Sequence, residues 1–135
     1  MARIYDIPIE MRFSDLDLYG HVNGVVYFQY LEAARVRLMS DQFQELTGKG
    51  LQLLVARAEC DYKVPILFGD RVVVSVTIPR IGTSSFDLEY RIHDGADRTF
   101  ATARTVMVCY DSGNSTTIPV PDQIRTMAEE TGESR

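Results

Sequence analysis

One stretch of the chain decides its fold: residues 12–35 read RFSDLDLYGHVNGVVYFQYLEAAR. Its first part, up to Asn23, holds two aspartates, a glycine, a histidine and an asparagine, which is loop composition. From about Gly24 to Gln44, apolar residues recur at steps of three and four, as in a helix. The first half of this helix is apolar on nearly every side, so we expect it to be enclosed on most sides. Asn23 is expected to cap the helix, and Gly48 and Gly50 mark the end of the region.

Strand-like segments lie on both sides of this helix. Residues 5–13 alternate apolar and polar, and Pro8 favours an edge position or a strand start. Four further strands are expected over residues 51–64, 71–81, 85–93 and 99–110. Consecutive strands without long crossovers favour antiparallel pairing. We therefore predict an α+β fold in which a five-stranded antiparallel sheet wraps around a long central helix, with a short C-terminal helix over about 122–130.

Length and composition exclude several classes of protein. The chain has 135 residues and a formal net charge of −5, which predicts a single domain over residues 1–135 and disfavours a nucleic-acid binder. The last residues, about 130–135, are polar and are expected to form a disordered tail. No apolar run approaches the roughly 20 residues of a membrane span, and the N-terminus lacks the apolar core of a signal peptide.

The cysteines and histidines predict neither a disulfide nor a metal site. Cys60 and Cys109 lie far apart in apolar, strand-like segments, as expected for buried, reduced thiols of a cytoplasmic protein. His21 and His93 are isolated, and no Cys/His group has zinc-ligand spacing. We therefore expect no metal.

The loop and the helix start resemble the D-x-D-x-x-G-H-V-N-N-x-x-Y signature of the hotdog-fold acyl-CoA thioesterases, in particular the 4-hydroxybenzoyl-CoA thioesterase-like group. The matching residues are Asp15, Asp17, Gly20, His21, Val22, Asn23 and Tyr27, with Glu32 and Arg35 matching an E-x-A-R string further along. Residues 62–65 (YKVP) and 68–70 (FGD) look like the family's link between strands. Gly24 replaces the second Asn of the signature, and Leu18 replaces the Pro of the 4-hydroxybenzoyl type. The namesake's aromatic substrate is therefore not supported.

The resemblance implies a catalytic role for three residues. Asp17 matches the family's carboxylate, which acts as nucleophile or as base for water, and the Gly24 backbone amide matches the group that polarises the thioester carbonyl. The physical chemistry agrees, because the first amides of a helix lack intrahelical partners and carry the positive end of its dipole. His21 is the third catalytic candidate, and the division of the catalytic roles between His21 and Asp17 stays open. Asp15 is expected to be a structural turn residue.

Binding residues are predicted more broadly. Coenzyme A belongs to the substrate, so no separate cofactor is expected, but its phosphates need cations. The candidate substrate-binding residues are Asn23, Tyr27, Arg57, Lys63, Arg80, Ser84 and Ser85. For each arginine or lysine in this list, the competing interpretation is a salt bridge on a solvated strand face. Asn23 and Tyr27 likewise have structural interpretations, as helix cap and as packing residue. Glu32 is held in reserve as an alternative catalytic carboxylate.

The expected activity is hydrolysis of an acyl-CoA thioester to a carboxylic acid and free CoA. Two alternatives stay open: a hotdog dehydratase or hydratase that acts on acyl-CoA or on an acyl carrier protein, and a non-enzymatic acyl-CoA-binding module. A single hotdog leaves sheet edges unpaired, so the resemblance implies a homodimer, with a homotetramer also expected.

Overall fold

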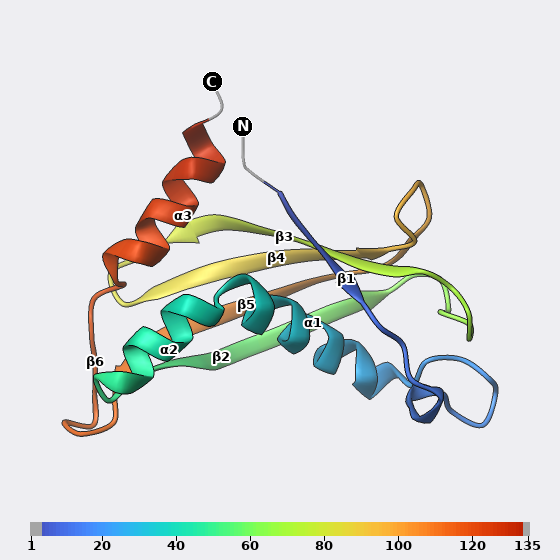
Figure 1. Ribbon diagram of the computed structural model, residues 1–135, viewed down its shortest axis with the longest axis horizontal. Helices are drawn as coiled ribbons and strands as arrows, with labels where there is room; N and C mark the ends of the chain where they lie inside the picture. The colour runs from blue at the N-terminus through green and yellow to red at the C-terminus, as the bar shows by residue number, and fades with distance from the viewer. Residues whose placement is uncertain (1–3, 134–135) are drawn as a thin grey trace.

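The computed structural model describes the backbone of residues 4–133 and the side chains of residues 4–128. Its elements in chain order are β1 (Tyr5–Ile9), a 3-10 turn η1 (Phe13–Asp15), α1 (Gly24–Leu38), α2 (Ser40–Gly48), β2 (Leu51–Tyr62), β3 (Val72–Ile81), β4 (Ser85–His93), β5 (Thr99–Asp111), β6 (Thr116–Thr117) and α3 (Asp122–Glu133). The strands form one antiparallel sheet in the order β1-β3-β4-β5-β2, and the two-residue β6 pairs with β5. The sheet runs behind α1 and α2 (Figure 1). The predicted α+β hotdog fold is confirmed, and β6 is a small addition to it.

Alternation of side chains explains how the sheet covers the helix. On β4, Phe86, Leu88, Tyr90 and Ile92 are all buried, and they share one face of the strand. The buried residues of α1 recur at helical spacing and belong to the same core cluster. They are Tyr27, Tyr30, Leu31 and Ala34. The opposite side of α1 is not enclosed, because Val25, Phe28 and Val36 are exposed. Within a single chain α1 is therefore enclosed on one side only, because one sheet covers only that side.

The predicted helix over 24–44 is in fact two helices. Met39 separates α1 from α2, with backbone angles φ −113° and ψ 22° that leave the helical range. The Met39 side chain is completely buried, and its amide still donates to the Arg35 carbonyl at 2.9 Å. The bend turns α2 towards the sheet, where Leu46 is also buried. Tertiary packing therefore ends α1 at a point where the local apolar pattern continues.

Smaller differences occur at the ends of the chain. The first strand ends at Ile9 rather than at residue 13, because Arg12 and Asp15 bond reciprocally and form the turn η1. Within the sheet, β1 pairs with β3 alone, so Pro8 lies on an edge strand as expected. The C-terminal helix runs to Glu133, beyond the predicted end near 130, and residues 134–135 of the predicted tail lie outside the described residues.

Both cysteines are free, in agreement with the expectation of reduced thiols. Cys109 is completely buried, whereas Cys60 is only half-buried on β2. None of the helices within residues 4–133 combines the length and the hydropathy that a membrane span requires.

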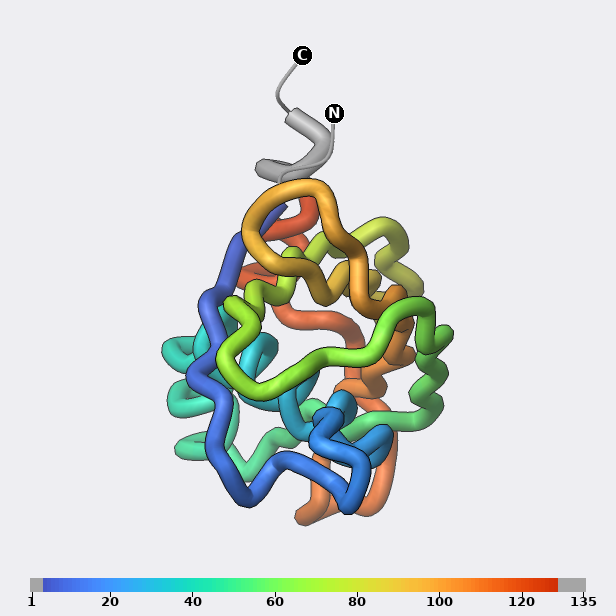
Figure 2. Tube along the Cα trace, turned by 90° about the vertical axis from the view of Figure 1, so that its right-hand side faces the viewer, coloured from blue at the N-terminus to red at the C-terminus, as the bar shows by residue number. Residues whose placement is uncertain are grey.

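Three loops gather at one end of the molecule. Figure 2 looks onto this end, where the loop of residues 10–23 (blue), the connection 63–71 (lime) and the turn 94–98 (orange) face the viewer. The first two loops are joined: His21 forms a bridge with Leu67, and the Val22 amide donates to the Ile66 carbonyl at 2.8 Å. The signature residues lie at this junction, next to the N-terminus of α1.

Candidate active site

Asp17 holds its own loop in shape. One carboxylate oxygen, Oδ1, accepts the backbone amides of Tyr19 at 2.9 Å and His21 at 3.2 Å. The Asp17 amide donates to the His21 carbonyl at 2.7 Å. No hydrogen bond to the second oxygen, Oδ2, is found within residues 4–128. One half of the carboxylate therefore fixes the turn, and the other half is available for chemistry.

The start of α1 is capped by Asn23. Its side-chain oxygen accepts the Val25 amide at 3.1 Å, and its carbonyl accepts the Val26 amide at 2.8 Å. The expected cap is confirmed, so the predicted substrate contact of Asn23 would compete with capping. Gly24 is the first helical residue, and its amide has no carbonyl one turn earlier within α1. A partial positive charge therefore lies at Gly24.

Asp17 and Gly24 line the same pocket. The hollow has a volume of about 320 Å³ and is bounded by Asp17, His21, Val22, Gly24, Tyr27, Tyr62, Lys63, Val64 and Pro65. The structure thus brings together all three predicted catalytic residues and two predicted binding residues, Tyr27 and Lys63. An aspartate, a histidine, a lysine and the first residue of a helix therefore line one largely apolar space, a set of residues that suits acyl transfer.

Tyr62 is a further residue of this pocket, and its sequence context in the link 62–65 does not predict a role in the site. Its hydroxyl donates to the Gly24 carbonyl at 2.8 Å. Its ring meets the Tyr27 ring edge-on, with centroids 4.8 Å apart and planes at 73°. The sequence shows only an aromatic residue at the end of a strand, next to Lys63. No neighbouring residue indicates that the Tyr62 side chain contacts α1.

The buried carboxylate of Asp15 stabilises the loop through hydrogen bonds. Asp15 is 1% exposed, and it accepts the Tyr30 hydroxyl at 2.8 Å and the Arg12 amide at 2.9 Å. The Arg12 guanidinium adds contacts of 3.1 and 3.2 Å. Burial by itself raises the pKa of Asp15, but these hydrogen bonds outweigh it and hold that pKa below its ordinary value. The Asp15 carbonyl also accepts the Asn23 amide at 2.8 Å, so Asp15 joins both ends of the loop to α1, as expected of a structural residue.

Comparison with known proteins identifies the family of the chain. The model of the thioesterase-like superfamily matches residues 11–127. The chain belongs to this family. It is 31% identical, over 88% of its own length and 84% of the relative's, to a 1,4-dihydroxy-2-naphthoyl-CoA hydrolase of Thermosynechococcus vestitus. It is 26% identical to the long-chain acyl-CoA thioesterase FadM of Escherichia coli, covering 90% of this chain and 95% of FadM.

Solved structures lead to the same conclusion. PA2801, a protein from Pseudomonas aeruginosa described as a putative thioesterase, superimposes with a TM-score of 0.80 and 36% identity. That match covers 91% of this chain and 95% of PA2801. A 1,4-dihydroxy-2-naphthoyl-CoA thioesterase from Synechocystis has a TM-score of 0.86 at 22% identity, with 97% and 99% covered, and supports the fold. The chain is therefore a thioester hydrolase of the acyl-CoA thioesterase type.

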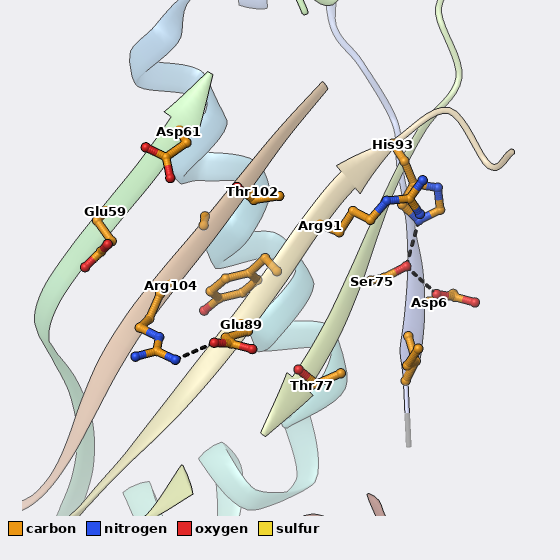
Figure 3. Close-up of a pocket in the computed structure, with 13 residues that line it drawn as sticks. Asp6, Glu59, Asp61, Ser75, Thr77, Glu89, Arg91, His93, Thr102 and Arg104 are labelled. Carbon is orange, nitrogen blue, oxygen red and sulfur yellow. Dashed lines mark hydrogen bonds and ion pairs between the residues drawn. The ribbon is translucent and has the colours of Figure 1, made fainter. Parts of the chain in front are cut away.

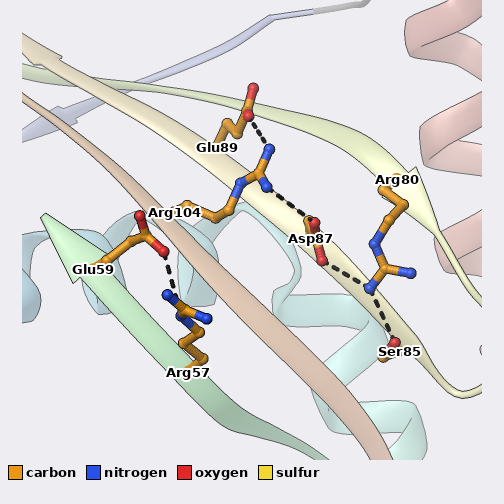
Figure 4. Close-up of polar contacts among 7 residues, drawn as sticks. All are labelled: Arg57, Glu59, Arg80, Ser85, Asp87, Glu89 and Arg104. Carbon is orange, nitrogen blue, oxygen red and sulfur yellow. Dashed lines mark hydrogen bonds and ion pairs between the residues drawn. The ribbon is translucent and has the colours of Figure 1, made fainter.

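The other predicted binding residues lie away from the pocket lined by Asp17 and Gly24. Arg80 bonds to Asp87 at 2.9 Å and to Ser85 at 3.1 Å, and Arg57 pairs with Glu59 at 3.4 Å (Figure 4). The Ser84 carbonyl accepts the Cys109 amide at 2.9 Å. Arg57, Arg80, Ser84 and Ser85 are thus occupied in contacts of the sheet and its β3–β4 turn. Their role in binding CoA stays a prediction.

A larger hollow of about 690 Å³ lies on the polar face of the sheet (Figure 3). Ser75 Oγ lies 2.5 Å from Asp6 Oδ1 and 2.6 Å from His93 Nε2, while His93 Nδ1 accepts the Gly95 amide. Burial, with the Arg91 charge, lowers the pKa of His93. Four carboxylates line the hollow, those of Asp6, Glu59, Asp61 and Glu89, against the guanidinium groups of Arg91 and Arg104. Its net negative charge disfavours the phosphates of CoA, so size alone does not identify the thioesterase site.

Proposed function

We propose that this protein hydrolyses acyl-CoA thioesters in the pocket lined by Asp17, His21 and Gly24. The observation that carries the proposal is that Asp17 and Gly24, the first residue of α1, line one largely apolar hollow. A nucleophile or base, together with a donor for the developing oxyanion, is the minimum that thioester hydrolysis needs. The curated relatives act on a hydroxylated naphthoyl-CoA and on long-chain acyl-CoA, so the CoA thioester is the shared element.

The thioester carbonyl oxygen is expected to accept the Gly24 amide at the positive end of α1. In one route, Asp17 Oδ2 attacks the carbonyl carbon, the C–S bond breaks, and the CoA thiolate leaves and takes up a proton. Water then hydrolyses the mixed anhydride, releases the acid and restores the Asp17 carboxylate. In the other route, Asp17 removes a proton from water, the hydroxide attacks the carbonyl carbon, the C–S bond breaks and the thiolate leaves, after which Asp17 gives its proton up to solvent. In both routes, His21 is the group proposed to hand a proton to the departing sulfur, and it takes up another from solvent.

Asp17→Asn tests the role of the carboxylate with little disturbance of the loop. The amide oxygen of asparagine can still accept the Tyr19 and His21 amides, so the turn is retained while the charge is lost. We expect kcat for thiol release to fall by about 100-fold or more. Asp97→Asn is the matched control, because Asp97 is an exposed loop carboxylate outside the pocket. A panel of aliphatic and aromatic acyl-CoAs serves as substrate.

Two outcomes contradict the proposal. Full activity in Asp17→Asn removes Asp17 from the mechanism. An absence of thiol release on every thioester in the panel removes hydrolysis itself, and hydration of an enoyl-CoA without thiol release then favours the hydratase alternative. That alternative rests on the presence of Asp17 and His21 in one pocket, which also suits addition of water.

The working unit is proposed to be a homodimer formed along β2, with tetramer formation a further expectation. Among the described strands, β2 pairs with β5 alone, so its other edge is unpaired within residues 4–133. Leu54 and Val55 on β2 and Val25 and Phe28 on α1 are exposed. A second copy would bury these side chains and pair the free edge. Glu32 lines a separate hollow of about 280 Å³ with Val25, Phe28 and Val55, away from Asp17 in one chain.

A further inference from the structure

Tyr62 forms one wall of the proposed acyl pocket although the core does not require it there. Its side chain is 53% exposed, so burial alone does not explain its fixed position. Three contacts hold it: its strand register opposite Ala101, the edge-on Tyr27 ring, and the hydroxyl bond to the Gly24 carbonyl. Burial raises the pKa of Tyr62, with the neighbouring Cys60 as a further cause, so its hydroxyl stays a donor at neutral pH.

Gly24 provides the space that this ring occupies. A Cβ built on Gly24 would lie 3.5 Å from the Tyr62 hydroxyl oxygen and 3.6 Å from the ring carbon that carries it. Those distances are ordinary van der Waals contact, but a longer side chain in that direction would meet the ring. The Tyr62 ring therefore occupies space that the absence of a side chain at Gly24 leaves open. This space lies beside the Gly24 amide, which is the group proposed to polarise the thioester.

We propose that Tyr62 sets the size of the acyl group that this site accepts and restricts it to compact acyl groups, an inference that rests on the thioesterase function proposed above. With the ring in place the hollow, which is open to solvent, measures about 320 Å³, near the lower end of the roughly 300–1,000 Å³ of small-molecule sites. Val22, Val64 and Pro65 add apolar walls, and their side chains offer an acyl group no hydrogen-bonding partner. Selection between acyl groups at these walls is therefore by size.

The test compares butyryl-CoA with dodecanoyl-CoA in the wild type, Tyr62→Ala and Tyr62→Phe. The wild type is expected to prefer butyryl-CoA in kcat/KM. Tyr62→Ala should lower this preference by about 10-fold or more, because removal of the ring opens the pocket. Tyr62→Phe keeps the ring and its contact with Tyr27, so it should retain the preference. Tyr110→Ala, a tyrosine on β5 outside the pocket, is the matched control and should leave the preference unchanged.

Other results overturn the inference. An equal preference in the wild type and Tyr62→Ala, with both substrates hydrolysed, refutes size selection by Tyr62 and leaves the thioesterase function standing. The same slowing of both substrates in Tyr62→Phe and Tyr62→Ala assigns Tyr62 to orienting the Gly24 peptide instead. Wild-type activity that is equal on both thioesters also contradicts the proposal.

A binding measurement separates this inference from the proposed function. The thioethers S-butyl-CoA and S-dodecyl-CoA cannot be hydrolysed, and calorimetry gives Kd for each without any reaction. We expect the ratio of the two Kd values to change in Tyr62→Ala but not in Tyr62→Phe or Tyr110→Ala, with Tm confirming that each variant is folded. If Tyr62→Ala changes the Kd ratio but the wild type releases no thiol, size selection by Tyr62 is supported and the hydrolysis proposal is rejected. An unchanged ratio rejects the size selection whatever the activity.

Discussion

Tyr30→Phe tests how the loop that carries Asp17 is supported. The substitution removes one hydroxyl from a side chain that is 4% exposed and leaves the ring volume unchanged. The lost contact is the 2.8 Å bond to Asp15, a carboxylate that is itself 1% exposed. A hydrogen bond to a buried charged group is worth about 1.5–3 kcal/mol, so we expect a loss of about 2 kcal/mol in the free energy of unfolding at pH 7. For a chain of this length, Tm should fall by roughly 5–10 °C.

The pH dependence of this loss follows from the direction of the Asp15 pKa shift. The folded-state pKa of Asp15 lies below its ordinary value, so its contribution to stability is present at pH values above the unfolded pKa. That contribution is lost as the pH falls through the folded pKa. Tyr30→Phe removes one of the bonds that lower this pKa, so the variant should lose stability at a higher pH than the wild type. The difference between the two proteins should be largest at neutral pH and shrink below about pH 4.

Urea unfolding at pH 7 and at pH 3 measures both effects, with an unchanged m-value as the sign of an intact folded state. Tyr90→Phe is the matched control, because the buried Tyr90 hydroxyl contacts the Thr105 hydroxyl at 2.7 Å and the Arg35 guanidinium, and neither group changes its charge between pH 3 and pH 7. Its loss should be about 1–3 kcal/mol and should not depend on pH over this range. A Tyr30→Phe deficit below about 0.5 kcal/mol at pH 7, or one that is as large at pH 3, would refute the reasoning.

Two further predictions concern the thiols and the assembly. Burial raises the pKa of the Cys109 thiol to about 11, so Cys109 should react with a thiol reagent at pH 8 only after unfolding, and fast labelling of Cys109 in the native Cys60→Ser variant would contradict this. Val55→Lys puts a charge on the exposed face of β2, so sedimentation should detect monomers where the wild type is dimeric, and an unchanged dimer would move the interface elsewhere.

Local patterns predicted much of the architecture. Alternation over residues 85–93 predicted β4 with the bounds that the structure has, because one face of that strand is buried and the other is polar. The loop composition before Gly24 and the cap residue Asn23 predicted where α1 begins. The same approach failed at Met39, where a buried side chain ends α1 inside a segment whose apolar pattern continues. A local pattern reports which side chains prefer burial, but it does not report where the partner surface ends.

The candidate site divides in the same way. Asp17, His21 and Gly24 were accessible to sequence reasoning because they lie within eight residues of one another and match a family signature. Arg80 was expected to meet phosphate, but the sheet register places it beside Asp87 and Ser85. The residues next to an arginine in the sequence do not indicate which anion its side chain contacts. The partner of Arg80 is therefore determined by strand pairing.

By itself, the sequence determined that this chain folds as a helix on an antiparallel sheet, and which loop carries the reactive carboxylate. Both depend on short-range order, namely the period of apolar residues and the spacing of a motif. The tertiary structure alone decided that Tyr62 reaches Gly24 across 38 residues and forms one wall of the pocket. It also decided that Asp15 is buried beneath the loop. These contacts join segments distant in sequence, and only the order and register of the strands bring such segments within hydrogen-bonding distance.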